Sequence, residues 1–258
     1  MNTIGQQRRL DGQVALVTGA GQGVGRGIAL ALAGAGAAVA LVSRTAAKLD
    51  VVAREIEARG SRALVLPCDV KDAAGLAAAV ERTVGALRGL QILVNAAQQV
   101  PLGRLEQVTD EAFEAGWQSG PLASFRLMKL ARPHLAKRGG VIINLASSAA
   151  LRWDASGYGA YGAVKEAIRQ LTRAAACEWA AEGIRVNTIL PLANSPGMQG
   201  WTTARPDEAA AFTATVPQGR VGDCEHDIGA FVVTLCSDDS RYVTGQSICV
   251  DGGQARLG

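Results

Sequence analysis

Tyr161 and Lys165, at positions i and i+4, are the side chains in this sequence best suited to proton transfer. Both fall in the first turns of a long predicted helix, where this spacing puts them on one face. A cation beside a phenol favours the phenolate, so we expect Lys165 to lower the pKa of Tyr161 toward the working pH. Ser147 and Ser148 follow an apolar run over residues 141–145, at the strand end where ligands bind in open α/β sheets. The set indicates acid–base chemistry at a bound ligand.

A glycine-rich turn over residues 18–25 reads T-G-x-x-x-G-x-G and separates an apolar run, 14–17, from a helical pattern, 26–33. Glycine adopts positive φ and lets the backbone come close to a ligand. The start of the helix offers unpaired N–H groups and the positive end of the helix dipole, which suit a pyrophosphate. On the glycines alone, a simple tight turn in a chain rich in alanine and glycine remains an equal alternative.

The residues after the second predicted strand, 38–42, bear on the choice of cofactor. In dinucleotide folds this position meets the adenosine ribose, and a carboxylate there would bond the 2′-hydroxyl and repel a 2′-phosphate. The sequence has Ser43 and Arg44 instead, and a hydroxyl and a guanidinium both suit a phosphate. We therefore expect NADP rather than NAD, with an ordinary solvated surface residue as the alternative explanation of Arg44.

Strand and helix patterns alternate along the whole chain, which predicts a parallel sheet with helices on both faces. We expect one doubly wound α/β domain over residues 1–258. The expected strands span 14–17, 38–42, 62–67, 91–94, 141–145, 185–189 and a segment ending near residue 250. The expected helices span 26–33, 46–59, 72–87, 109–137, 161–182 and 225–237.

Composition argues against several other classes of protein. The chain has 258 residues with 48% hydrophobic and 19% charged content, which is typical of a globular protein. Its net charge of +3 is too small to indicate a nucleic-acid partner, and no uncharged run is long enough for a comfortable membrane span. Residues 1–10 lack the apolar stretch of a signal peptide. Five cysteines without CxxC spacing and two distant histidines indicate no metal site and favour a reducing, cytoplasmic compartment.

The motifs together resemble the short-chain dehydrogenase/reductase family over about residues 10–253. They are the glycine turn, the serine–tyrosine–lysine set and the closing V-T-G-Q…D-G-G of residues 243–253. Within the family the chain is similar to the 3-oxoacyl reductase and hydroxysteroid dehydrogenase-like group. The resemblance implies a Rossmann-type doubly wound sheet of about seven strands. It also implies an NADP-dependent oxidoreductase that interconverts a secondary alcohol and a ketone by hydride transfer.

The resemblance also assigns the catalytic roles. Tyr161 would give its proton to the carbonyl oxygen, a serine would bond that oxygen, and Lys165 would hold the nicotinamide ribose and keep the pKa of the tyrosine low. The family's usual spacing to the tyrosine selects Ser148, whereas alignment from Asn144 along the strand selects Ser147. We favour Ser148 and keep Ser147 as the alternative.

By the same resemblance, the cofactor contacts come from the glycine turn and from the ends of the following strands, with Asp69 meeting the edge of the adenine ring. The expected cofactor-binding residues are Gly19, Gln22, Gly23, Val24, Gly25, Ser43, Arg44, Asp69, Val70, Asn95, Ala96, Ala97, Tyr161, Lys165 and Pro191.

Two departures from the family pattern lie near the expected cofactor site. The family's N-N-A-G segment reads N-A-A-Q over residues 95–98, so Gln98 puts a bulky polar side chain near the cofactor or the substrate entry. Leu192 stands where the family has glycine after a proline. Because leucine adopts positive φ only at a cost, this turn must differ locally.

A third departure concerns the family's catalytic asparagine, whose place Gly120 takes. Pro121 follows and cannot donate to the carbonyl of Trp117, so we expect a kink or bulge within the helix 109–137. A main-chain carbonyl at the kink could still hold the water that the family uses. The departures keep a second hypothesis open, a dinucleotide-binding regulatory or scaffold protein with little turnover.

Residues 192–222 are weakly periodic, and the resemblance implies that they cover the substrate, with a short helix near 207–213. Trp153 is a candidate for lining the same pocket. The expected partners are a small ketone or alcohol and further copies of the chain, in a homotetramer or homodimer, and neither nucleic acid nor a membrane. By the same resemblance, the long helices that hold Gly120 and Lys165 would pair with those of another copy across a two-fold axis. Their outer faces would carry Leu171, Ala175 and Trp179.

Overall fold

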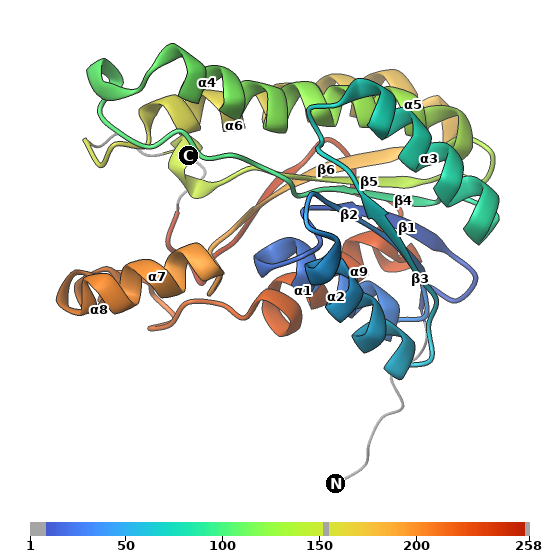
Figure 1. The fold of residues 1–258 in the computed structure, drawn as a ribbon, viewed down its shortest axis with the longest axis horizontal. Helices are drawn as coiled ribbons and strands as arrows, with labels where there is room; N and C mark the ends of the chain where they lie inside the picture. Colours follow the sequence, from blue (N-terminus) through green and yellow to red (C-terminus); the bar gives the residue numbers. More distant parts are fainter. Residues whose placement is uncertain (1–8, 152–154, 256–258) are drawn as a thin grey trace, which may run out of the picture.

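The computed structural model describes residues 9–151 and 155–255. All strands pair in parallel in one seven-stranded sheet, in the order β3-β2-β1-β4-β5-β6-β7 (Figure 1). The predicted doubly wound sheet is therefore confirmed, with its switch point between β1 and β4. The strands are β1 Val14–Thr18, β2 Ala38–Ser43, β3 Ala63–Pro67, β4 Ile92–Asn95, β5 Val141–Leu145, β6 Arg185–Pro191 and β7 Ser247–Val250.

Helices cover both faces of this sheet (Figure 1). α1, α2 and α9 pack on one face, and α3, α5 and α6 pack on the other. The helices are α1 Gly23–Gly34, α2 Ala46–Ala58, α3 Ala73–Leu87, α4 Asp110–Trp117, α5 Ala123–Leu135, α6 Gly159–Trp179, α7 Pro196–Ala204, α8 Pro206–Ala214 and α9 Ala230–Cys236.

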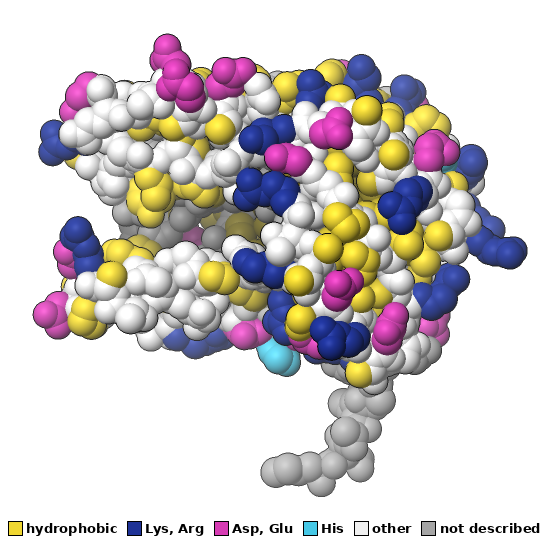
Figure 2. Space-filling model, in the orientation of Figure 1, with side chains coloured by type: hydrophobic (Ala, Val, Ile, Leu, Met, Phe, Trp, Pro, Cys, Tyr) yellow, Lys and Arg dark blue, Asp and Glu magenta, His cyan; other side chains and the backbone are white. Residues whose placement is uncertain are grey.

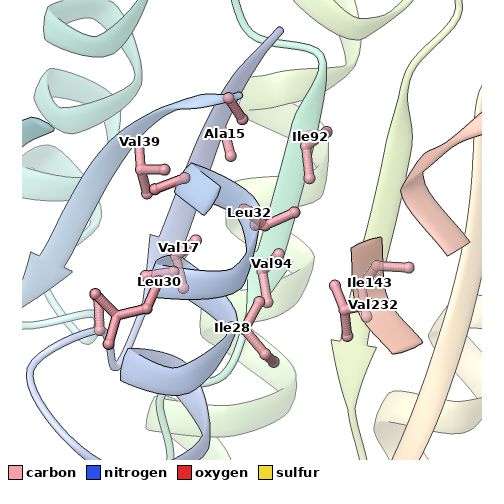
Figure 3. Packing of buried hydrophobic residues seen from close by; sticks show 14 of the residues in the cluster. Ala15, Val17, Ile28, Leu30, Leu32, Val39, Ile92, Val94, Ile143 and Val232 are labelled. Atoms are coloured by element: carbon pink, nitrogen blue, oxygen red, sulfur yellow. The ribbon is translucent and has the colours of Figure 1, made fainter. Parts of the chain in front are cut away.

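Each face of the sheet has its own apolar core. On one face, Ile28 and Leu32 of α1 pack against strand residues such as Val17 and Val94, with Val232 of α9 beside them (Figure 3). On the other face, buried residues of α3, α5 and α6 close a second core. The inner strands β1, β2, β4, β5 and β6 are thus buried on both sides, as their unbroken apolar runs predict, whereas the edge strands β3 and β7 are half-buried. The two cores fix the carboxyl ends of β1, β4 and β5, which carry the candidate site.

The predicted helix over 109–137 is interrupted at Pro121. A π-helical turn, Gln118–Leu122, separates α4 from α5. Proline has no N–H for the helical ladder, and a locally wider turn accommodates the missing bond. The expected kink or bulge is confirmed in the form of a bulge.

The segment over 193–222 contains more regular structure than the sequence indicated. α8 matches the expected short helix, whereas α7 was not expected. Its start is signalled by Ser195, whose side chain accepts a hydrogen bond from the N–H of Met198, and by Pro196 in the first turn. Figure 1 shows both helices projecting from the sheet on the side of its β6 end, and Figure 2 shows a hollow between them and the part of the molecule that carries α4, with hydrophobic side chains on its walls.

Candidate active site

α6 brings Tyr161 and Lys165 to the carboxyl end of β5. The Lys165 side chain is buried, and its Nζ donates a 2.7 Å hydrogen bond to the carbonyl of Leu145, the last residue of that strand. The same Nζ lies 5.4 Å from the centroid of the Tyr161 ring. The structure therefore holds the phenol and the amine together at the edge of the sheet where the sequence placed them.

The serine that contacts Tyr161 is Ser147. A side-chain hydrogen bond joins the two residues, while Ser148 begins a 3₁₀ turn and is buried. The Ser147 Oγ also accepts a 3.2 Å bond from the N–H of Ala149, which fixes its direction. The geometry thus favours the alternative serine over Ser148, because the chain turns directly after position 147.

Burial dominates the protonation of both groups. It raises the pKa of Tyr161 to about 12, against the lowering effect of the Ser147 bond, and the nearby Tyr158 adds to the rise. Burial also lowers the pKa of Lys165 to about 7. The expected lowering of the tyrosine pKa by the lysine is therefore absent in this structure. A lysine that is partly neutral near pH 7 exerts little cationic field on the phenol.

The glycine turn closes tightly at the end of β1. Gly19 has a φ of 67°, and a Cβ on it would lie 3.0 Å from the N of Ala97. A Cβ on Gly25 would lie 2.5 Å from the carbonyl oxygen of Gly19. Gln22 precedes α1, and its side chain makes no capping hydrogen bond to that helix. The backbone N–H groups at the start of α1 are therefore left to face the turn. The turn therefore fits a pyrophosphate.

Ser43, at the end of β2, lies against the glycine turn. A Cβ on Gly21 would be 3.0 Å from the Ser43 Oγ and 3.2 Å from the Cβ of Lys48. The Lys48 Nζ donates a 2.5 Å bond to the Oε1 of Gln22, and Arg44 is exposed next to this group. Lys48 was missed in the sequence. The position of Lys48 in the sequence could have indicated a binding role. A cation in the first turn of a helix interacts unfavourably with the helix dipole, so a negatively charged ligand nearby would explain it.

Asp69 and Val70 take part in local structure at the end of β3. The Asp69 Oδ1 accepts a 3.0 Å bond from the N–H of Lys71, and the two side chains form an ion pair at 3.9 Å. Val70 packs into the second core, and Val24 of α1 packs against the first. The turn role of Asp69 is thus visible, and an adenine contact remains a prediction.

Asn95 ties the central strands together. Its Nδ2 donates to the Oδ1 of Asn144 at 2.8 Å, and the Nδ2 of Asn144 donates to the Oγ1 of Thr172 in α6, also at 2.8 Å. The N–H groups of Ala96 and Ala97 donate to the Oγ1 of Thr18, at 3.0 and 3.1 Å. This network holds β1, β4, β5 and α6 in register around the site.

The turn after β6 differs from a glycine turn, as expected. Leu192 has a negative φ. Within the described ranges, Arg88 is the only non-glycine residue with a positive φ. Its N–H donates to the carbonyl of Val250 at 3.1 Å, and its carbonyl accepts from the N–H of Gly222 at 3.2 Å. Pro191 ends the strand just before this turn. Trp153, a candidate for the pocket wall, lies outside the described residues.

Within residues 9–151 and 155–255, no group of three or more His, Cys, Asp or Glu side chains is arranged to hold a metal ion. In the same ranges no helix is long and apolar enough to cross a membrane.

The glycine turn and the Tyr161–Lys165 pair meet at the edge where doubly wound sheets bind dinucleotides. Fold and site together define a dinucleotide-dependent enzyme of the Rossmann type. Comparison with known proteins then gives the family.

A family model described as enoyl-(acyl carrier protein) reductase matches residues 19–255. A 12α-hydroxysteroid dehydrogenase from Clostridium sp. is 35% identical over 95% of this chain and 98% of its own length. A galactitol 2-dehydrogenase (L-tagatose-forming) from Cereibacter sphaeroides is 36% identical, over 95% of this chain and 96% of that one. The solved structure of a 7α-hydroxysteroid dehydrogenase with NADH and 7-oxo glycochenodeoxycholic acid has a TM-score of 0.90 at 29% identity, covering 100% of this chain and 99% of that one.

This chain belongs to the short-chain dehydrogenase/reductase family. It is an NAD(P)-dependent oxidoreductase that acts on CH–OH groups.

Proposed function

We propose that the protein is an NADP-dependent oxidoreductase that interconverts a secondary alcohol and a ketone, with Tyr161 as the acid–base group. The observation that carries this proposal is the contact of Tyr161 with Ser147 on one side and Lys165 on the other. The activities named for the relatives, at a steroid 12α-hydroxyl and at position 2 of galactitol, are both oxidations of secondary alcohols.

Each side chain has one task in the reducing direction. The bound nicotinamide supplies the hydride. Tyr161 gives its proton to the carbonyl oxygen, and with a pKa of about 12 it is protonated at neutral pH. Ser147 donates a hydrogen bond to the same oxygen and fixes its position. Lys165, with a pKa of about 7, can give a proton to the tyrosinate and recover it near neutral pH.

Ser147→Ala is expected to reduce kcat about 10²-fold, the effect of removing one donor to a developing oxyanion. Ser148→Ala makes the matched control, and its kcat should stay within a few-fold of wild type, because Ser148 packs in the 3₁₀ turn. Steady-state rates of both variants, measured with one ketone that the wild type reduces, decide between the two serines. The opposite order of effects would return the role to Ser148.

Cofactor preference is proposed from Ser43, Arg44 and Lys48, which surround the edge of the glycine turn. Arg44→Asp should weaken NADPH binding by roughly tenfold or more and improve NADH binding, because a carboxylate would repel the 2′-phosphate. Arg54→Asp, on the α2 helix that begins just after Arg44, is the control. Equal affinity of the wild type for NADPH and NADH, measured by nucleotide fluorescence, would contradict this preference.

We also propose that residues 192–222 cover the substrate within one domain spanning residues 1–258. A Cβ on Gly23 would lie 3.2 Å from the Cδ of Pro196, so α7 begins beside the glycine turn. Trp201 of α7 packs edge-on against Phe212 of α8, with ring centroids 5.7 Å apart. The pair joins the two helices into one wall of the hollow seen in Figure 2.

The proposed homotetramer or homodimer needs different contact residues from those expected. Ala175 and Trp179 are buried in the second core of the same chain and face no partner. Exposed aromatic side chains lie instead on α4 and α5, namely Phe113, Trp117 and Phe125. Burying them against a second copy is favourable.

Light scattering at micromolar concentration should give an oligomeric mass for the wild type. Trp117→Asp with Phe125→Asp should lower that mass, because two charges in an apolar interface cost several kcal/mol. Arg54→Asp with Arg82→Asp is a control for surface charge. A monomeric wild type would contradict the proposal.

The proposed location is the cytoplasm, where thiols stay reduced. In support, all the cysteines of the chain are free in the structure: Cys68, Cys177, Cys224, Cys236 and Cys249.

A further inference from the structure

The segment that follows β4 gathers buried polar atoms without partners. Among the described residues, five buried side-chain atoms have no hydrogen-bond partner, and three of them belong to Asn95, Gln98 and Gln99. All three are amide oxygens, which only accept hydrogen bonds. Buried acceptors are normally paired with the protein or with ordered water, so these oxygens are candidate water-binding groups.

Gln98 fills the space beside Gly120. A Cβ on Gly120 would lie 2.3 Å from the Oε1 of Gln98 and 3.1 Å from its Nε2. The first distance is far below van der Waals contact and the second is tighter than usual, so residue 120 cannot carry a side chain while Gln98 keeps this position. Gln98 therefore places an amide in the space that a side chain at position 120 would take.

Two hydrogen bonds fix the direction of this amide. The Gln98 Nε2 donates to the carbonyl of Gln99 at 2.6 Å and to the carbonyl of Gly116 at 2.9 Å. In a π-helical turn residue i bonds residue i−5, and Pro121 has no N–H to offer the carbonyl of Gly116, so Gln98 gives that carbonyl a donor. Ser119 completes the clamp, because its Oγ accepts a 2.8 Å bond from the N–H of Gln99. Since Nε2 must face two carbonyls, Oε1 is left as the free acceptor.

This acceptor is held at the same edge of the sheet as the catalytic pair. The π-helical turn Gln118–Leu122 packs against α6, which carries Tyr161 and Lys165. Asn95 of β4 is in register with Asn144 of β5, and the next residue of β5, Leu145, binds the Lys165 Nζ. Gln98 thus follows the carboxyl end of β4, and Lys165 is bound at the carboxyl end of the neighbouring strand, β5.

We propose that Gln98 is a positioning residue for the reaction: its amide clamps the interrupted helix to residue 99 and presents Oε1 as a fixed acceptor for a water that exchanges protons with Lys165. The inference rests on the proposed function. Proton balance is simple. Tyr161 loses one proton to the substrate oxygen, Lys165 returns one to the tyrosinate, and the water passes a proton from the solvent to Lys165.

A double-mutant cycle tests this role. Gln98→Ala should lower kcat about tenfold or more, with KM for NADPH within about twofold and a changed pH profile of kcat, because proton recovery is impaired. Gly120→Asn alone should lower both kcat and Tm, because the new side chain overlaps Gln98. The double variant should regain most of kcat and Tm, since the amide then comes from position 120 and has room. Gln118→Ala, at a half-buried glutamine of the same turn whose side chain bonds Glu114, is the control.

The outcomes separate the two proposals. Wild-type kcat in Gln98→Ala, or a double variant no more active than the better single variant, would overturn the positioning role. Recovery of Tm without recovery of kcat would also overturn it and leave Gln98 a packing role. A wild type that reduces no ketone would instead contradict the proposed function, and the Tm values would still report whether positions 98 and 120 share one space.

Discussion

Tyr161→Phe is expected to reduce ketone turnover by at least about 10²–10⁴-fold, the range for loss of a general acid. The change removes the phenolic O–H and little else. The ring can keep its place beside Lys165 and Tyr158, whose ring centroid lies 6.2 Å from that of Tyr161. Cofactor affinity should therefore stay within about threefold of wild type, since the lost group acts on the substrate oxygen.

Tyr158→Phe is the matched control, because it removes the same atom one helical turn away. Its turnover should remain within a few-fold of wild type. Comparing kcat and NADPH affinity for the two variants isolates the chemical role of one hydroxyl. Tyr161→Phe with a large share of wild-type turnover would show that another group supplies the proton.

Lys165→Met should abolish most turnover and at the same time stabilise the fold. Methionine has a similar length and no charge, and the lysine amine is buried with a pKa lowered from 10.5 to about 7. A shift of this size corresponds to a cost on the order of 5 kcal/mol for charging the folded protein. Loss of the bond to the Leu145 carbonyl offsets about 1 kcal/mol of the gain.

The stability gained by Lys165→Met depends on pH in a direction that the pKa of Lys165 fixes. Because the folded pKa of Lys165 lies below its unfolded value of 10.5, the unfolded chain binds more protons between these limits. The cost is therefore complete below about pH 7 and falls as the pH rises toward 10.5. Urea unfolding at about pH 6 and about pH 9 should show a larger advantage of Lys165→Met at the lower pH. A variant that is less stable than wild type at both pH values would contradict the buried-amine account.

The elements that local patterns specify could be predicted from the sequence. Unbroken apolar runs marked the buried parallel strands, and β5 begins and ends as expected. The missing N–H of Pro121 predicted the interruption between α4 and α5. The i, i+4 spacing predicted the approach of Tyr161 and Lys165, because a helix fixes that geometry.

Features set by distant contacts could not be predicted. Which serine meets Tyr161 depends on how the chain turns after β5, and the structure favours Ser147. Trp179 was placed on an outer face, yet it is buried against the second core. The pKa of Tyr161 depends on its burial, which the spacing to Lys165 does not reveal.

The departures at positions 98 and 120 show the same limit. In the sequence they are separate losses, and they supported the hypothesis of a binding protein with little turnover. In three dimensions Gln98 occupies the space of a side chain at Gly120, and on this ground we propose that the two changes compensate each other.

The most direct test of the central claim is the rate of NADPH consumption by the wild-type protein with a broad panel of ketones. The panel should include steroid ketones and keto sugars, in view of the relatives' activities. The account predicts turnover of at least one ketone, a preference for NADPH over NADH, and loss of that turnover in Tyr161→Phe. Tight NADPH binding without consumption across the whole panel would contradict it and would favour a regulatory or scaffold protein that only binds the dinucleotide.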